Sequence, residues 1–515
     1  MFRFRLVLSM IAAGAVAAHA AYALRAGSTV PPSGRLSDGV PYVVPVVSDR
    51  AAFELAFSSD ERYLLIASAL GDAGRTFDVT IRGADDADGR TSLLTPLAPL
   101  AATRPAATAL PWTTASEPDV TTPSPRREFF LHVTDGPLDD PRQYTRVAGR
   151  VVAERSGVRV YLDEQQSVEE LAPGLADEIA QRLEGEIIPA YRQRFGACRD
   201  VDGDGALTVL LTPWLGRLQG GRTSVAGFVR GADFDAAIEA PFGNRCDMLY
   251  LNSSLSGGES LQALLAHEFM HAVSASIRLP GGATREGLIA PADWLNEALA
   301  HLGENLLSSS WANLDHRVSR YLASPQEAPL TVEDYYRAGR WRDHGCRGAT
   351  YLFLRWCVEQ SGEELLPALV YSRGRGEDAF ENAMGVPFRE LYRHWSVALA
   401  RQDALGAGDA EPTSLAPVPL RGRIGREEVG GPRRIPVDLS EGQRLFRVCG
   451  TATAYLELSS RRPGRQRVRI EAAPGADLQI TLIRMAAGRN RIRPMRCRRG
   501  SVGDRRCSRE STLKW

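Results

Sequence analysis

The sequence predicts an α+β protein in which a mixed sheet followed by helices forms the centre and small β-sandwich-like domains flank it. Short apolar runs separated by Ser, Asp and Gly turns occur near both ends of the chain, and this pattern is typical of β-strands. Between them, strand-like runs give way at Leu261 to a stretch with helical spacing that continues to about Gln402. With 515 residues, of which 44% are hydrophobic and 24% are charged, the chain is long enough for two or three domains.

The first 23 residues have the layout of a cleaved secretory signal. Arg3 and Arg5 precede an apolar run from Leu6 through Val16, and small residues with an Ala-x-Ala pattern follow. A permanent membrane anchor is the alternative, but the run is near the lower length limit for spanning a bilayer. We therefore expect a secreted or periplasmic protein with no membrane contact after signal cleavage.

Composition divides the rest of the chain into four parts. Residues 24–96 are rich in short strand-like runs and predict an N-terminal β-domain. Residues 97–126 are rich in Pro, Ala and Thr with little periodicity, so we expect a linker. Residues 127–405 carry the central α+β domain, and residues 406–515 predict a C-terminal β-domain with a basic tail.

The charge balance gives no reason to expect nucleic acid as a partner. Lys plus Arg and Asp plus Glu both number 62, so the chain has no net charge to attract a polyanion or an anionic membrane. Partners must therefore be inferred from individual sites, and the oligomeric state cannot be inferred at all.

Seven cysteines in an exported chain predict some disulfides, with at least one thiol left over. Buried reduced thiols are the alternative. Proximity along the chain favours the pairs Cys198–Cys246, Cys346–Cys357 and Cys497–Cys507, with Cys449 unpaired.

A helix with two histidines is the strongest functional pattern in the chain. Ser256 to Glu259 has the form of a capping box, and apolar residues then follow at three- and four-residue spacing until Pro280. On such a helix His267 and His271 project from one face, one turn apart, with Glu268 beside them. This is the H-E-x-x-H arrangement, which predicts that the two imidazoles bind one zinc ion.

A catalytic zinc site needs a third protein ligand, and the segment from Asp293 to Glu304 offers three candidates. Leucines form a helical stripe on one face of this segment, while Glu297, His301 and Glu304 lie on another. Glu297 is our choice because a carboxylate completes a His, His, Glu set. His301 and Glu304 are then expected to orient the ligands, although either could replace Glu297 as the third one.

The segment His267-Glu-Phe-Met-His271, together with Trp294-Leu-Asn-Glu-Ala-Leu-Ala300, resembles the gluzincin metallopeptidases, in which an Asn-Glu helix supplies the third ligand. It is most similar to exported bacterial peptidases of the hyicolysin type, and the resemblance covers roughly the middle half of the chain. It implies a zincin-like catalytic domain. The chain departs from the family pattern in two places, and both concern the residues around the metal ligands more than the ligands themselves. Twenty-five residues separate His271 from Glu297, and His301 stands where thermolysin-like enzymes place an Asp.

These residues predict peptide hydrolysis, with Glu268 as the base that takes a proton from a zinc-activated water. The substrate would be a protein or peptide. An aminopeptidase and a non-catalytic binding or adhesion module are the alternatives, and the intact Glu268 argues against the second.

The resemblance also implies a Tyr or His on a later helix that stabilises the oxyanion. We rank His344 first because it stands just before a predicted helix, with a surface histidine as the alternative. The other candidates are Tyr335, Tyr336 and Tyr351.

The strand-like run Met248 to Asn252 lies just upstream of the metal helix. In enzymes of this kind it would be the edge strand to which an extended substrate adds by main-chain hydrogen bonds. An interior strand is an equal alternative.

A second cation site is predicted at Asp200, Asp202 and Asp204, which with Gly205 match the first half of a calcium loop. Leu211 stands where such a loop has its bidentate Glu, so calcium would need another carboxylate, with Asp233 or Asp235 as possible donors. The alternative is a solvated turn that leads into a strand.

Overall fold

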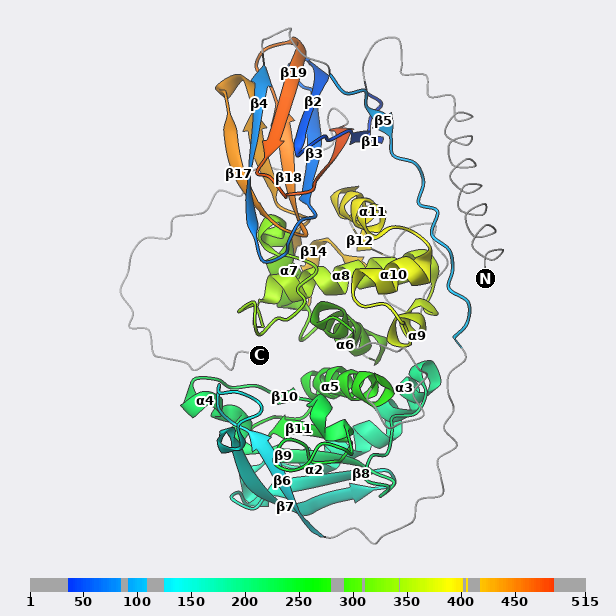
Figure 1. Ribbon diagram of the computed structural model, residues 1–515, viewed down its shortest axis with the longest axis vertical. Coiled ribbons are helices and arrows are strands. Elements are labelled where there is room, and N and C mark those ends of the chain that lie inside the picture. Colours follow the sequence, from blue (N-terminus) through cyan, green and yellow to red (C-terminus); the bar gives the residue numbers. More distant parts are fainter. Residues whose placement is uncertain are drawn as a thin grey trace, which may run out of the picture.

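The computed structural model consists of a β-sandwich and a central α+β domain (Figure 1). It describes residues 36–84, 91–108, 125–278, 291–307, 311–341, 343–401, 404–405 and 417–485. The predicted signal segment lies outside these ranges, as does the basic tail.

The sandwich combines strands from both ends of the chain. One sheet has the order β16-β18-β3-β20-β1-β5, and the other has the order β17-β4-β19-β2. The N-terminal strands are β1 (Pro41–Val44), β2 (Arg50–Phe57), β3 (Arg62–Ala69), β4 (Thr76–Ala84) and β5 (Thr95–Pro96). The C-terminal strands are β16 (Arg434–Asp438), β17 (Arg444–Cys449), β18 (Ala452–Ser459), β19 (Gly464–Ala472) and β20 (Leu478–Met485). In Figure 1 the blue and orange strands accordingly share the same sheets.

The expectation of separate N-terminal and C-terminal β-domains is therefore wrong. β3 lies between β18 and β20 and pairs with both in antiparallel register, so each end of the chain supplies strands that the other end needs. Alternation along β3 explains why this sheet is buried on both faces. Leu65 packs inside the sandwich, whereas Leu64 and Ile66 pack against the core of the central domain.

The central domain begins with a mixed sheet, as predicted. Its strand order is β10-β11-β9-β8-β7-β6, in which β9 runs parallel to both β8 and β11 while the remaining pairs are antiparallel. The strands are β6 (Arg126–His132), β7 (Tyr144–Arg155), β8 (Val158–Asp163), β9 (Leu207–Thr212), β10 (Gly227–Phe228) and β11 (Met248–Asn252). Helices α2 (Leu175–Arg182) and α3 (Ile188–Phe195) come between β8 and β9, and the short α4 (Leu218–Gly221) follows β9.

Helices follow the sheet, also as predicted. They are α5 (Glu259–Arg278), α6 (Asp293–Leu307), α7 (Asp315–Ala323), α8 (His344–Ser361), α9 (Leu365–Val370), α10 (Glu377–Met384) and α11 (Phe388–Arg401). α6 packs against both α5 and α8, and α7 packs against α8 (Figure 1). Short strands β12 (Ala404–Leu405), β13 (Val418–Pro419), β14 (Arg421–Ile424) and β15 (Glu427–Gly430) lead back to the sandwich. None of the helices in the described ranges is long and apolar enough to cross a membrane.

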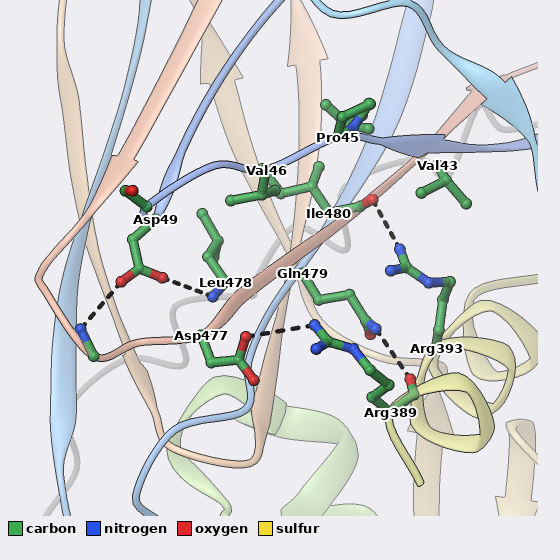
Figure 2. Close-up of a pocket in the computed structure, with 13 residues that line it drawn as sticks. Val43, Pro45, Val46, Asp49, Arg389, Arg393, Asp477, Leu478, Gln479 and Ile480 are labelled. Carbon is green, nitrogen blue, oxygen red and sulfur yellow. Dashed lines mark hydrogen bonds and ion pairs between the residues drawn. The ribbon is translucent and has the colours of Figure 1, made fainter. Parts of the chain in front are cut away.

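Hydrogen bonds join helix α11 to the sandwich beside a cavity of about 510 Å³ (Figure 2). The Arg393 guanidinium donates to the carbonyl oxygen of Ile480 at 3.1 Å, and the Gln479 amide donates to the carbonyl oxygen of Arg389 at 3.0 Å. The cavity is lined by β1, the start of β20 and α11, and none of the predicted catalytic or metal-binding residues lines it. We therefore regard it as part of the seam between the two domains.

Two of the expected disulfides are absent. Cys198, Cys246, Cys346, Cys357 and Cys449 are all free thiols, and the predicted pair Cys497–Cys507 lies outside the described residues. Cys346 and Cys357 stand on the same helix α8, where 11 residues correspond to a rise of roughly 16 Å. A disulfide needs Cα atoms within about 7 Å, so this pair cannot form.

Candidate metal centre

Helices α5 and α6 bring His267, His271 and Glu297 together. The Nε2 atoms of the two histidines lie 3.2 Å apart, and Glu297 approaches them with one carboxylate oxygen each. Its Oε2 is 3.6 Å from Nε2 of His267, and its Oε1 is 4.0 Å from Nε2 of His271. The three predicted ligands thus face one another, and their ligand atoms fall within 4.8 Å.

Glu304 lies behind this cluster and accepts three hydrogen bonds. Nδ1 of His267, Nδ1 of His301 and the amide of Asn313 each lie 2.8 Å from its Oε1. The bond to Glu304 places the proton of His267 on Nδ1, so its Nε2 presents a lone pair to His271 and Glu297. Of the two residues expected to orient ligands, Glu304 therefore contacts a ligand histidine directly.

His301 completes the same network from the interior of α6. Its side chain is fully buried, and its Nε2 has no hydrogen-bond partner among the described residues. This nitrogen is 3.8 Å from Oε2 of Glu297, so His301 lies close to the cluster.

Burial sets the protonation states that a metal site needs. It lowers the pKa of His267 well below its usual value, and the nearby His271 acts in the same direction, so the imidazole is neutral. Burial would raise the pKa of Glu297, but the charge of Arg347 outweighs burial and lowers the value to about 2. Burial raises the pKa of Glu304 to about 8, against the effects of Arg317 and Asn313. Since its second oxygen can carry the proton, Oε1 accepts its hydrogen bonds in either state.

This donor set fits a zinc ion. Nε2 of His267 carries a lone pair and faces Nε2 of His271 at 3.2 Å. Two nitrogen atoms at this distance require a proton or a cation between them. Nδ1 of His271 is buried without a hydrogen-bond partner in the described structure, so Nε2 is the nitrogen of that ring that contacts the other candidate ligands. Two neutral imidazoles and one ionised carboxylate are the ligand types of catalytic zinc sites.

Arg347 on α8 also contacts the cluster, and this residue was not predicted from the sequence. Its Nη1 lies 2.7 Å from Oε2 of Glu297, and its guanidinium lies over the ring of Tyr335, 5.6 Å from the centroid. The one available indication was its position three residues after His344, which places both side chains on the same side of α8.

Glu268 is next to the cluster but is not engaged by it. The residue is 5% exposed, and its Oε2 has no hydrogen-bond partner among the described residues. Burial raises its pKa well above the usual value, and the charges of Glu297 and Glu304 add to the effect. A buried carboxylate with a raised pKa and a free oxygen is suited to take up a proton.

No protein-family model matches the chain. The chain is similar to a neutral metalloprotease. This relative, ShpI of Staphylococcus hyicus, is 23% identical over 270 residues, which are 48% of this chain and 59% of the relative. The chain thus resembles a metalloprotease over about half of its own length.

The strand Met248–Asn252 is not the edge of the sheet. β11 is fully buried and is flanked by β9 on one side and by the two-residue β10 on the other. The edge strand is therefore β10, and its Gly227 adjoins Glu268: a Cβ atom on this glycine would lie 3.2 Å from Cγ of Glu268. The interior-strand alternative is confirmed.

His344 begins α8, where Asp343 caps the helix. Its ring packs edge-on against His316 with centroids 4.6 Å apart, and within the described residues no hydrogen bond or ion pair joins it to Glu268 or to the three candidate ligands. Burial and the charge of Arg317 lower its pKa to about 4. Its role at the oxyanion stays a prediction.

The three tyrosines considered beside His344 have different surroundings. Tyr335 is buried under Arg347, and its hydroxyl has no hydrogen-bond partner in the described ranges. Tyr351 donates to Asn305, and Tyr336 is 61% exposed. Tyr335 is thus the tyrosine that contacts a residue of the metal centre.

The predicted calcium loop does bring Asp200, Asp202 and Asp204 together, but each carboxylate already has partners. Asp200 accepts from two backbone amides, Asp202 pairs with Arg127, and Asp204 pairs with Arg159. Of the proposed extra donors, Asp233 is committed elsewhere, since Arg230, Asn244 and Tyr250 all donate to it. Calcium binding here stays a prediction.

Proposed function

We propose that this protein is an exported, zinc-dependent metalloendopeptidase of the gluzincin type, in which His267, His271 and Glu297 hold the metal. The observation that carries the proposal is the 3.2 Å approach of two histidine Nε2 atoms beside the Glu297 carboxylate. Glu268 lies on the same helix, and its Oε2 has no hydrogen-bond partner among the described residues, so it can act as the base that hydrolysis requires. Export is inferred from the signal pattern in residues 1–23.

The chemistry that bound zinc supplies is Lewis acidity, which polarises a substrate carbonyl and makes water a stronger nucleophile at neutral pH. Glu268 accepts the proton of the attacking water and then delivers it to the leaving amine. Its raised pKa favours the first of these steps, because a carboxylate with a higher pKa is a stronger base. Glu304 keeps His267 in the tautomer that presents Nε2 to the metal.

An extended protein or peptide substrate would bind along the outer edge of β10. This strand is at the edge of the sheet and passes directly beside Glu268. Main-chain pairing at such an edge gives affinity with little dependence on side chains, which suits an endopeptidase. The absence of a side chain at Gly227 leaves room for Glu268, whose Cγ would lie 3.2 Å from a Cβ there.

The decisive experiment compares zinc content and casein hydrolysis for the mature chain and its Glu268→Gln variant. We expect both proteins to bind one zinc ion and only the wild type to cleave casein. A wild type that binds zinc but cleaves no protein or peptide would instead favour a binding or adhesion module.

Glu297→Ala tests the third ligand separately. We expect this variant to lose zinc, while Glu333→Ala on the surface retains it as a matched control. Full zinc occupancy in Glu297→Ala would move the third ligand to His301 or Glu304. An aminopeptidase would be recognised by release of single N-terminal residues from peptides that have no internal cleavage.

A further inference from the structure

Arg347 forms an ion pair with the candidate ligand Glu297, and the proposed function does not use it. Its Nη1 is 2.7 Å from Oε2 of Glu297, and both side chains are only 16% exposed. Within the described ranges, Glu297 is the one carboxylate within ion-pair distance of this guanidinium. The ring of Tyr335 lies under the guanidinium and holds it in place.

The oxygen that Arg347 contacts also faces the metal ligands. Oε2 of Glu297 is 3.6 Å from Nε2 of His267 and 3.8 Å from Nε2 of His301. The other oxygen, Oε1, is 4.0 Å from Nε2 of His271. A guanidinium and a metal ion would therefore draw on the same carboxylate at the same time.

We propose that Arg347 is a positioning residue that shares Glu297 with the metal ion, so that the ion is bound less tightly but stays more electron-deficient toward the substrate. The inference rests on the proposed function and concerns the regulation of the same site. A carboxylate that already accepts a strong hydrogen bond from a guanidinium donates less charge to a metal. The guanidinium also repels the metal ion, because both are positively charged. The surroundings of the buried pair have a low dielectric constant and therefore screen this repulsion only weakly.

The proposal predicts effects of opposite sign when the charge of Arg347 is removed. Zinc should bind more tightly, because the repulsion is gone and Glu297 donates more charge. Turnover should fall, because the same change reduces the Lewis acidity of the metal. An ion pair with only a structural role would give a different result, since its loss would disorder Glu297 and weaken zinc binding and turnover together.

The test uses the full mature chain in four forms: wild type, Arg347→Met, Arg347→Gln and Arg347→Lys. Met and Gln both remove the charge, and Gln keeps a hydrogen-bond donor and serves where the Met variant does not fold. Lys keeps the charge and is the rescuing substitution. Arg340→Met is the matched control, because Arg340 pairs with Asp343 and does not contact Glu297. Zinc affinity is measured by competition with a chromophoric chelator, and kcat is measured on a peptide at saturating zinc.

We expect zinc to bind Arg347→Met and Arg347→Gln at least tenfold more tightly than it binds the wild type, with kcat lowered at least tenfold. Arg347→Lys should stay within threefold of the wild type in both measurements, and Arg340→Met should match the wild type. Unchanged or weaker zinc binding in the two neutral variants overturns the proposal, as does tighter binding with unchanged kcat. A wild type that binds no zinc would instead refute the proposed function itself.

Discussion

Replacement of Glu304 by Ala should weaken zinc binding although this residue is not a ligand. Its Oε1 accepts hydrogen bonds from His267, His301 and Asn313, each at 2.8 Å. Removal of an acceptor behind a metal-binding histidine typically reduces metal affinity 10- to 100-fold, or by about 1.4 to 2.7 kcal/mol. Two buried donors, His267 and His301, and the half-buried Asn313 lose their partner. Because an unpaired buried donor costs about 1 to 3 kcal/mol, the free energy of unfolding should fall by about 2 kcal/mol or more.

Glu304→Gln is the matched variant, since its amide oxygen can still accept while the possibility of a negative charge is gone. We expect Gln to retain zinc within about threefold of the wild type, because the bonds to Oε1 form with either protonation state of the carboxyl. Chelator competition gives the zinc affinity, and thermal unfolding in the presence of excess chelator gives the stability without metal.

The reasoning fails if Glu304→Ala binds zinc as tightly as the wild type, since the tautomer of His267 would then be set by something else. If Gln and Ala lose zinc equally, the charge of Glu304 matters and its role as an acceptor does not. In both cases the zinc affinity of each variant is compared with that of the wild type.

Three further predictions concern the substrate edge, the sandwich and the dependence of stability on pH. Gly227→Ala should retain zinc but lose about tenfold in kcat/KM, because the new Cβ would lie 2.9 Å from Cδ2 of Leu251 and 3.2 Å from Cγ of Glu268; unchanged peptide cleavage would contradict the role of β10. Leu65→Ala should lower the free energy of unfolding by about 2–5 kcal/mol in urea titrations, because this fully buried side chain lies in the strand that joins both ends of the chain. Burial alone would raise the pKa of Asp315, but hydrogen bonds from Arg426 and His316 outweigh it and lower the pKa below 3.8. The ionised carboxylate therefore stabilises the fold above pH 3.8, and this stabilisation is lost as the pH falls through the pKa of the folded protein. Wild type should therefore lose stability more steeply than Asp315→Asn between about pH 5 and 3, and parallel curves would show that Asp315 is not responsible.

The helix that carries His267 and His271 was predictable because all of its determinants are local. A cap, an apolar stripe and a stop within about 25 residues define it, and the structure has α5 at Glu259–Arg278. The approach of Glu297 was predictable to the extent that a second amphipathic helix follows nearby. The choice among Glu297, His301 and Glu304 depended on resemblance, because the rotation of α6 against α5 is a matter of tertiary packing.

The sandwich was not predictable in this form because alternation of apolar residues identifies a strand but not its partner. β3 and β18 pair across almost 400 residues of sequence, from Leu65 to Leu456. Neither segment carries a motif that specifies the other, and each looked like part of a small independent domain. The central domain is thus inserted between two halves of one β-domain, so the N-terminal strands cannot be removed without loss of the C-terminal ones.

The contact of Arg347 with Glu297 was not predictable, because a single arginine on a helix forms no sequence pattern. Arg347 lies 50 positions after Glu297, and the ion pair forms only because α8 packs against α6. In a chain with 62 basic residues, nothing in the sequence distinguishes this one from arginines that point into solvent.

The charges around the candidate ligands bear on how strongly the site attracts a metal ion. Burial raises the pKa of both Glu268 and Glu304, so these two carboxyls hold a proton more firmly than exposed ones do, whereas Glu297 is ionised. Arg317 and Arg347 carry positive charges near the cluster, while the histidines are neutral. Each of these positive charges opposes the binding of a divalent cation, and replacement of Arg347 by a neutral residue would remove one of them. The charge balance of the buried cluster is thus a second reason to expect tighter zinc binding when Arg347 is replaced by a neutral residue.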